Sequence, residues 1–177
     1  MIKFPLVEGL RPTSNRIRET LFNWLRDDIT GEDCLDLFAG SGACGIEALS
    51  RGARSAHFVE INDQAAAMIE QNLVMLKASS ARVYSTDVLK WLSTGLQADE
   101  NRFGLVFVDP PYQENLELEC CQLLEHSGRL KSSAWIYLES DKILSVDSLP
   151  ENWSIEKTKK AGSVKFYLIK RIKSAEK

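Results

Sequence analysis

The segment Asp109-Pro110-Pro111-Tyr112 combines residue types that suit chemistry on an amino group. It follows the apolar run 105–108 directly, and ligands of open α/β sheets bind where such strands end. The two prolines fix φ and remove two N–H donors, so the segment is stiff and rich in acceptors. The Asp109 carboxylate and the Pro110 carbonyl can accept both hydrogens of an exocyclic amine and turn its lone pair toward an electrophile, while Tyr112 can stack on a flat base. The simpler alternative is a tight Pro-Pro turn with an incidental aspartate.

A second motif suits a nucleoside-containing cofactor. Residues 38–45 read F-A-G-S-G-A-C-G, a G-x-G-x-x-G loop between an expected strand and an expected helix. Glycine lets the backbone approach a ligand closely and turn into the helix. Glu60 ends the next expected strand, twenty residues after Gly40, where a carboxylate can accept from both ribose hydroxyls. The alternative is a structural turn with a solvated Glu60.

Chain length distinguishes two cofactors that this loop could bind, a nicotinamide dinucleotide and S-adenosylmethionine (SAM). A dinucleotide needs two mononucleotide-binding halves. A hydride-transferring enzyme also needs a substrate domain, for which 177 residues leave no room. We therefore expect a single SAM-binding domain over residues 1–177, whose first 30 residues form a substrate-facing segment and a helix.

The charge distribution divides the chain into an acidic body and two basic ends. The formal net charge of −3 argues against a nucleic-acid partner, yet residues 1–26 carry +3, residues 157–177 carry +7 and the residues between them carry −13. If the ends meet in space, they form a patch that could neutralise phosphates. The alternatives are solvated termini and, for the lysines of residues 157–173, protection of an edge strand.

Composition excludes several other classes of protein. Hydrophobic residues make up 44% and charged residues 27% of the chain, as in a globular domain. No uncharged apolar run approaches the ~18–20 residues that span a bilayer, and the N-terminus lacks the apolar core of a secretory signal. The cysteines show no C-x-x-C spacing, so we expect reduced thiols in a cytoplasmic protein and no metal site.

Hydrophobic periodicity predicts the elements that position both motifs. A first helix follows residue 14. Strands are expected over residues 34–38, 55–60, 82–85, 105–108 and 134–139, helices over 41–51, 63–77, 87–96 and 114–126, and a closing hairpin over 153–158 and 164–170. This alternation implies right-handed βαβ units and a doubly wound α/β sheet whose last strand is antiparallel.

Longer stretches carry a resemblance to a known family. They are R-P-T-S-N-R-I-R-E-T-L-F-N-W-L (11–25), L-D-L-F-A-G-S-G (35–42) and E-A-L-S-R-G-A (47–53). D-P-P-Y itself resembles the catalytic motif of amino-directed methyltransferases. Together they resemble the bacterial 16S rRNA guanine-N2 methyltransferases of the RsmD type, from about Leu10 to Lys170. The resemblance implies a seven-stranded Rossmann-like SAM-dependent fold and methylation of one small-subunit guanine in assembled rRNA–protein particles.

The resemblance also implies roles for individual residues. The target guanine would be held by Asp109, Pro110, Pro111 and Tyr112. The substrate or the bound SAM would be contacted by Arg11, Thr13 and Arg16, whose alternative is helix capping and a solvated basic face. SAM would be bound by Asp36, Phe38, Gly40, Gly42, Gly45, Glu60, Asp87 and Val88. Family members usually have a basic, glycine-containing stretch before this signature, whereas here only ten residues precede Arg11.

The expected reaction is direct transfer, with no covalent enzyme intermediate and no metal. Asp109 would orient the amine and stabilise the positive charge that develops on its nitrogen, and the guanine would have to be unstacked to enter the site. One alternative is an amino-methyltransferase acting on another RNA, DNA adenine or a protein amide. Another is a non-catalytic rRNA-binding assembly factor. We expect a monomer with no membrane partner.

Overall fold

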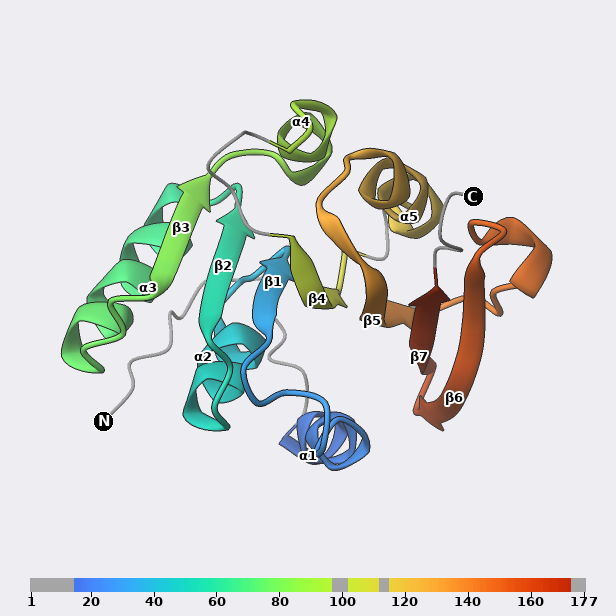
Figure 1. Cartoon of the computed structure of the whole chain (residues 1–177), viewed down its shortest axis with the longest axis horizontal. Helices are drawn as coiled ribbons and strands as arrows, with labels where there is room; N and C mark the ends of the chain where they lie inside the picture. The colour runs from blue at the N-terminus through green and yellow to red at the C-terminus, as the bar shows by residue number, and fades with distance from the viewer. Residues whose placement is uncertain (1–14, 97–101, 112–114, 173–177) are drawn as a thin grey trace.

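The computed structural model describes residues 15–96, 102–111 and 115–172, which fold around one central sheet. Within them the sheet has seven strands in the order β3-β2-β1-β4-β5-β7-β6 (Figure 1). Their bounds are β1 Asp33–Leu37, β2 Ser55–Glu60, β3 Ala81–Ser85, β4 Phe103–Val108, β5 Leu130–Ser140, β6 Trp153–Ala161 and β7 Val164–Ile172. Strands β1 to β5 are parallel, and β7 is antiparallel to both of its neighbours. The predicted fold class, including the antiparallel last strand, is therefore confirmed.

Helices cover both faces of the sheet (Figure 1). One group is α1 (Asn15–Trp24), α2 (Ala43–Ser50) and α3 (Asp63–Met75), and the other is α4 (Val88–Ser93) and α5 (Glu117–His126). Because both faces are covered, every residue of β1, β2 and β4 is buried, as central parallel strands require.

Each face has its own apolar core. The core beneath α1 and α2 contains Phe22, Phe58 and Phe107. The core on the opposite face contains Trp91 of α4 and Leu124 of α5. A buried sheet with two cores holds the strand ends rigidly, which is the requirement for a site built at those ends.

The element ends differ from the sequence-based expectation in several places. The strand over residues 55–60 is confirmed at both ends, but β5 begins at Leu130 rather than at residue 134. The polar residues 131–133 hide this extension in the sequence, whereas pairing of Leu130 with Phe103 across a register shift reveals it. Strand ends are set by such pairing, which local sequence does not contain. The helix expected over 114–126 begins only at Glu117, because Asn115 adopts φ 54°, outside the helical region; residue 114 lies outside the described part.

The described residues bear on the expectations about the cysteines, a metal site and a membrane-spanning segment. All four cysteines are free thiols, and Cys34, Cys120 and Cys121 are buried. The described histidines, cysteines and acids form no group suited to a metal ion. No described helix has both the length and the apolar character needed to cross a membrane.

Candidate active site

The carboxyl ends of β2, β1, β4 and β5 bring the candidate residues to one edge of the sheet. Leu37 of β1 pairs with Val59 of β2 and with Val108 of β4. Val108 in turn pairs with Leu138 of β5. The residues that follow these positions therefore lie in one row, with neighbouring strands about 4.8 Å apart. This row holds Phe38, Glu60, Asp109 and Glu139.

Glu60 is tied directly to the glycine loop. Its Oε2 accepts a hydrogen bond from the Gly40 N–H at 2.7 Å, and its Oε1 accepts from the Asn62 N–H at 2.7 Å. The side chain is only 6% exposed. Each carboxylate oxygen has a second lone pair, which leaves capacity for a pair of ligand hydroxyls. Gly40 and Glu60, which the sequence pairs by their spacing of twenty residues, are thus in direct contact.

The loop between β1 and α2 contains a strained turn. Phe38 adopts φ 60°, a region that side-chain-bearing residues rarely occupy, and Gly42 adopts φ 72° as the N-cap of α2. The Gly42 N–H donates to the Ala39 carbonyl at 2.7 Å, which closes the turn. Backbone strain of this kind concentrates at ligand sites, and it supports the assignment of this loop as a binding element.

Asp36 and Gly45 support the loop from beneath. Asp36 Oδ2 accepts from the Gly45 N–H at 2.8 Å. A Cβ on Gly45 would lie 2.3 Å from Cε1 of Phe58, so only glycine allows α2 to pack this closely on β2. Burial is the main cause that raises the pKa of Asp36 to about 7; the hydrogen bond from the Gly45 N–H opposes the rise, and the negative charge of Glu60 adds to it. The direct contacts of Asp36 and Gly45 with a cofactor stay predictions.

Asp87 and Val88 lie at the start of α4, next to the end of β2. Asp87 is the N-cap of the helix, and its Oδ1 accepts from the Lys90 N–H at 2.8 Å. The preceding residue, Thr86, donates its N–H to the Glu60 carbonyl at 3.0 Å. Val88 is buried, while Asp87 is half-buried. Asp87 therefore lies near Glu60, and its role toward an adenine amine stays a prediction.

Asp109 and Pro110 follow β4 and lie beside the glycine loop. Asp109 is half-buried, Pro110 is buried and Pro111 is exposed. Asp109 follows Val108, the partner of Leu37, so it is the neighbour of Phe38 at the sheet edge. Tyr112 lies outside the described residues, as do Arg11 and Thr13. The structure therefore brings the D-P-P segment and the glycine loop together.

Arg16 lies apart from this row, on the first turn of α1. Its side chain is exposed, and its carbonyl accepts from the Thr20 hydroxyl at 3.0 Å. This position leaves the guanidinium available to a substrate, and its contact with one stays a prediction.

One acid at the site was not singled out from the sequence. Glu139 is 3% exposed and accepts a hydrogen bond from the Tyr137 hydroxyl at 2.6 Å. Burial, followed by the charges of Asp36, Asp109 and Glu139, raises the pKa of Cys44 well above its usual value, so all three acids lie within electrostatic reach of that thiol. The sequence signal that could have identified Glu139 is an acid at the carboxyl end of an apolar strand, and the same signal identified Glu60.

Together these groups form a candidate site with the arrangement expected of a Rossmann-like methyltransferase. A nucleoside-type loop with an acid at the next strand end lies beside an acceptor-rich D-P-P segment suited to an amine. The same fold occurs in a protein crystallised in complex with SAH, with a TM-score of 0.70 at 13% identity over 88% of this chain and 48% of that one.

Closer relatives identify the family. A family model described as Conserved hypothetical protein 95 matches residues 1–170. Ribosomal RNA small subunit methyltransferase D of Escherichia coli strain K12 is 43% identical over 163 residues, 92% of this chain and 80% of that protein. The solved structure of Escherichia coli yhhF has a TM-score of 0.84 at 42% identity, covering 97% of this chain and 92% of that chain. The chain therefore belongs to the Conserved hypothetical protein 95 family and to that of ribosomal RNA small subunit methyltransferase D, which confirms the resemblance seen in the sequence.

Proposed function

We propose that this protein transfers a methyl group from SAM to the exocyclic N2 amine of a guanine in 16S rRNA. The observation that carries the proposal is the strand register that makes Asp109 the neighbour of the glycine loop. A carboxylate that can accept hydrogen bonds from an amine thereby lies beside a loop suited to a nucleoside. Transfer between two bound molecules requires such proximity. The name of the Escherichia coli relative supports small-subunit rRNA as the substrate.

The residues at the sheet edge fit SAM as the cofactor. The lone pairs that Glu60 retains beside its bonds to Gly40 and Asn62 suit the two ribose hydroxyls. The backbone of the turn at Phe38 and Gly42 would hold the methionine portion of SAM. Asp87, which precedes α4, would accept a hydrogen bond from the adenine amine. When bound, SAM supplies an electrophilic methyl group.

Asp109 and the Pro110 carbonyl hold the acceptor amine for attack. Each accepts one amine hydrogen, so the nitrogen lone pair is directed at the methyl carbon. Bound SAM would supply the methyl group to this nitrogen, and the Asp109 carboxylate would stabilise the positive charge that the nitrogen acquires. The amine then loses one proton to Asp109 or to water. Positioning and electrostatics account for the rate in this scheme.

The substrate that we propose is a guanine presented by an assembled small-subunit particle, in keeping with the similarity to ribosomal RNA small subunit methyltransferase D. The guanine must be unstacked to reach Asp109. We further propose that the protein acts as a monomer, in the cytoplasm, and without a metal.

Transfer of a tritiated methyl group tests the function. The substrates are small-subunit particles lacking the modification, free 16S rRNA, DNA and total protein. We expect N2-methylguanosine, formed on particles. Asp109→Asn should slow single-turnover transfer roughly 10²–10³-fold, since its amide donor would face the amine donor, with SAM affinity retained. Asp147→Asn, an exposed acid outside the site, is the matched control.

Three outcomes would contradict the proposal. Methylation of adenine or a protein amide would indicate another amino-methyltransferase. Particle binding without any transfer would indicate a non-catalytic assembly factor. Transfer by Asp109→Asn at the wild-type rate would make the D-P-P segment structural.

A further inference from the structure

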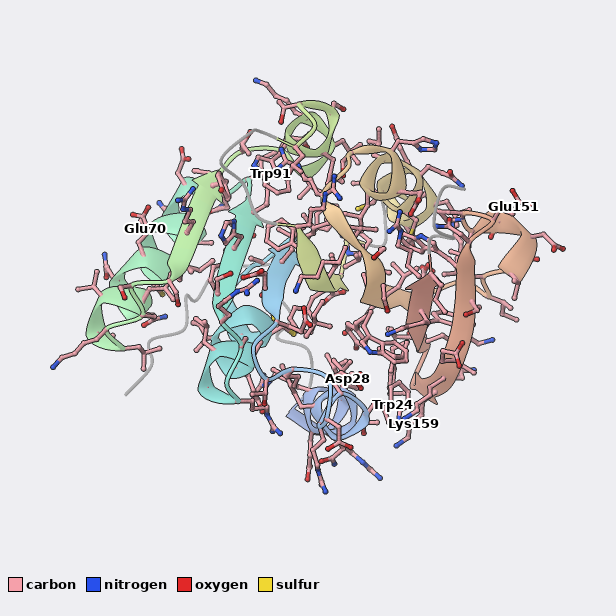
Figure 2. All side chains as sticks on the ribbon, in the orientation of Figure 1. Trp24, Asp28, Glu70, Trp91, Glu151 and Lys159 are labelled. Atoms are coloured by element: carbon pink, nitrogen blue, oxygen red, sulfur yellow. The ribbon has the colours of Figure 1, made fainter. Side chains whose placement is uncertain are left out.

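The two basic ends of the described chain meet in space. Helix α1 packs against the β6–β7 hairpin, where the Trp24 and Phe166 rings lie 5.6 Å apart between centroids. Lys159 Nζ donates to the Thr20 hydroxyl at 3.5 Å, and Figure 2 shows Lys159 next to Trp24. The sequence left open whether the two basic ends adjoin. In the structure α1 and the hairpin do.

At its tip the hairpin carries positive charge that no acid among the described residues pairs with. Residues 157–172 contain six basic residues and no acidic one. Arg171 is neutralised by Glu125 at 2.8 Å. By contrast, no ion pair within the described residues involves the hairpin-tip lysines, Lys159, Lys160 and Lys165. Lys159 and Lys160 are exposed.

The strand register places these lysines at the catalytic edge. Glu139, which neighbours Asp109, pairs with Phe166, and Phe166 pairs with Lys159. Three strand spacings therefore separate the backbones of Asp109 and Lys159, about 14 Å. Lys165 pairs with Ser140, one residue beyond Glu139. These positive charges thus flank the position at which the acceptor amine would be held.

We infer that the hairpin-tip lysines bind backbone phosphates of the rRNA that flank the target guanine. This inference rests on the proposed function. Lysines bind phosphates as point charges and position the nucleic acid without reading its sequence, which leaves base selection to the D-P-P-Y segment. Arg16, one helical turn before Thr20, extends the same surface from α1.

Edge-strand protection explains these lysines less well. Lysines on an exposed edge strand such as β6 discourage pairing with another molecule. Lys165, however, belongs to β7, which is paired on both sides by β5 and β6. An interior strand needs no such protection, whereas a phosphate contact at the hairpin tip accounts for all three lysines.

The salt dependence of particle binding tests the inference. The affinity for unmethylated small-subunit particles is measured by filter binding across a salt series. Each lost phosphate contact should make the slope of log K against log salt less steep by about 0.7–0.9. We expect a change of about 1.4–1.8 for Lys159→Ala/Lys160→Ala and about 0.7–0.9 for Lys165→Ala. All should keep the wild-type Kd for SAM.

The matched control is Lys77→Ala/Arg82→Ala. It removes two exposed positive charges from β3 and the turn before it, the opposite edge of the sheet, and its slope should equal that of the wild type. Equal slopes for all variants would overturn the inference. Aggregation of Lys159→Ala/Lys160→Ala with unchanged particle affinity would instead establish edge protection. Wild-type particle binding without methyl transfer would refute the proposed function and leave the docking surface standing.

Discussion

Replacing Glu60 with glutamine separates its structural role from its role in binding the cofactor. Both carboxylate oxygens accept a backbone N–H at 2.7 Å, one from Gly40 and one from Asn62. Glutamine keeps the size of the side chain but replaces one oxygen with an NH2 group. That group would face an N–H, donor against donor, so one of the two bonds is lost whichever way the amide turns.

The magnitude follows from the burial and the charge of these bonds. A hydrogen bond to a charged group contributes about 1.5–3 kcal/mol, and Glu60 is only 6% exposed. We expect a loss of that size in the free energy of unfolding, which lowers Tm by roughly 3–12 °C for a domain of this length. A similar loss toward the ribose hydroxyls would raise the Kd for SAM roughly 10- to 150-fold.

Thermal unfolding and calorimetric titration with SAM measure the two effects on the same samples. Glu70→Gln, an exposed acid on α3, is the control and should change neither quantity. A lower Tm with a wild-type Kd would refute the ribose assignment and leave Glu60 as a support of the loop. Tighter binding of NADH than of SAM by the wild type would refute the cofactor class.

Two further predictions concern the groups beneath the loop. Asp36 has a native pKa of about 7 against a reference of 3.8, so its stabilising contribution is complete below about pH 4 and is lost as pH rises to 7, because the unfolded chain releases the proton first. Asp36→Asn removes this dependence. Urea titrations at pH 4–7.5 measure the unfolding free energy of wild type and variant, and the difference between the two proteins should change by roughly 4 kcal/mol over this range. Parallel curves of unfolding free energy against pH would contradict the raised pKa. Gly45→Ala forces a Cβ against Phe58 and should cost about 1–3 kcal/mol in urea unfolding. Phe58→Leu in the same chain should recover part of that loss, and a single variant as stable as wild type would refute the close packing.

Local sequence determined the parts of the site that depend on neighbouring residues. The apolar run before D-P-P-Y and the glycines after the first strand indicated which residues end strands and begin helices. The strand over 55–60 was predicted at both ends, because the polar residues Ser55 and Glu60 stand on either side of its mainly apolar stretch. Glu60 followed from its place at a strand end, and the Gly40 contact supplies the physical reason for its spacing.

Tertiary structure alone decided which strand ends lie side by side. The order β1-β4-β5-β7-β6 makes Glu139 a neighbour of Asp109 and brings Lys159 into the same row, although Glu139 and Lys159 lie tens of positions after Asp109 in the chain. Such pairings bring together segments that are distant in sequence, so no local pattern contains them. The requirement for glycine at position 45 has the same origin. It depends on the ring of Phe58, which only the packing of α2 on β2 brings within reach.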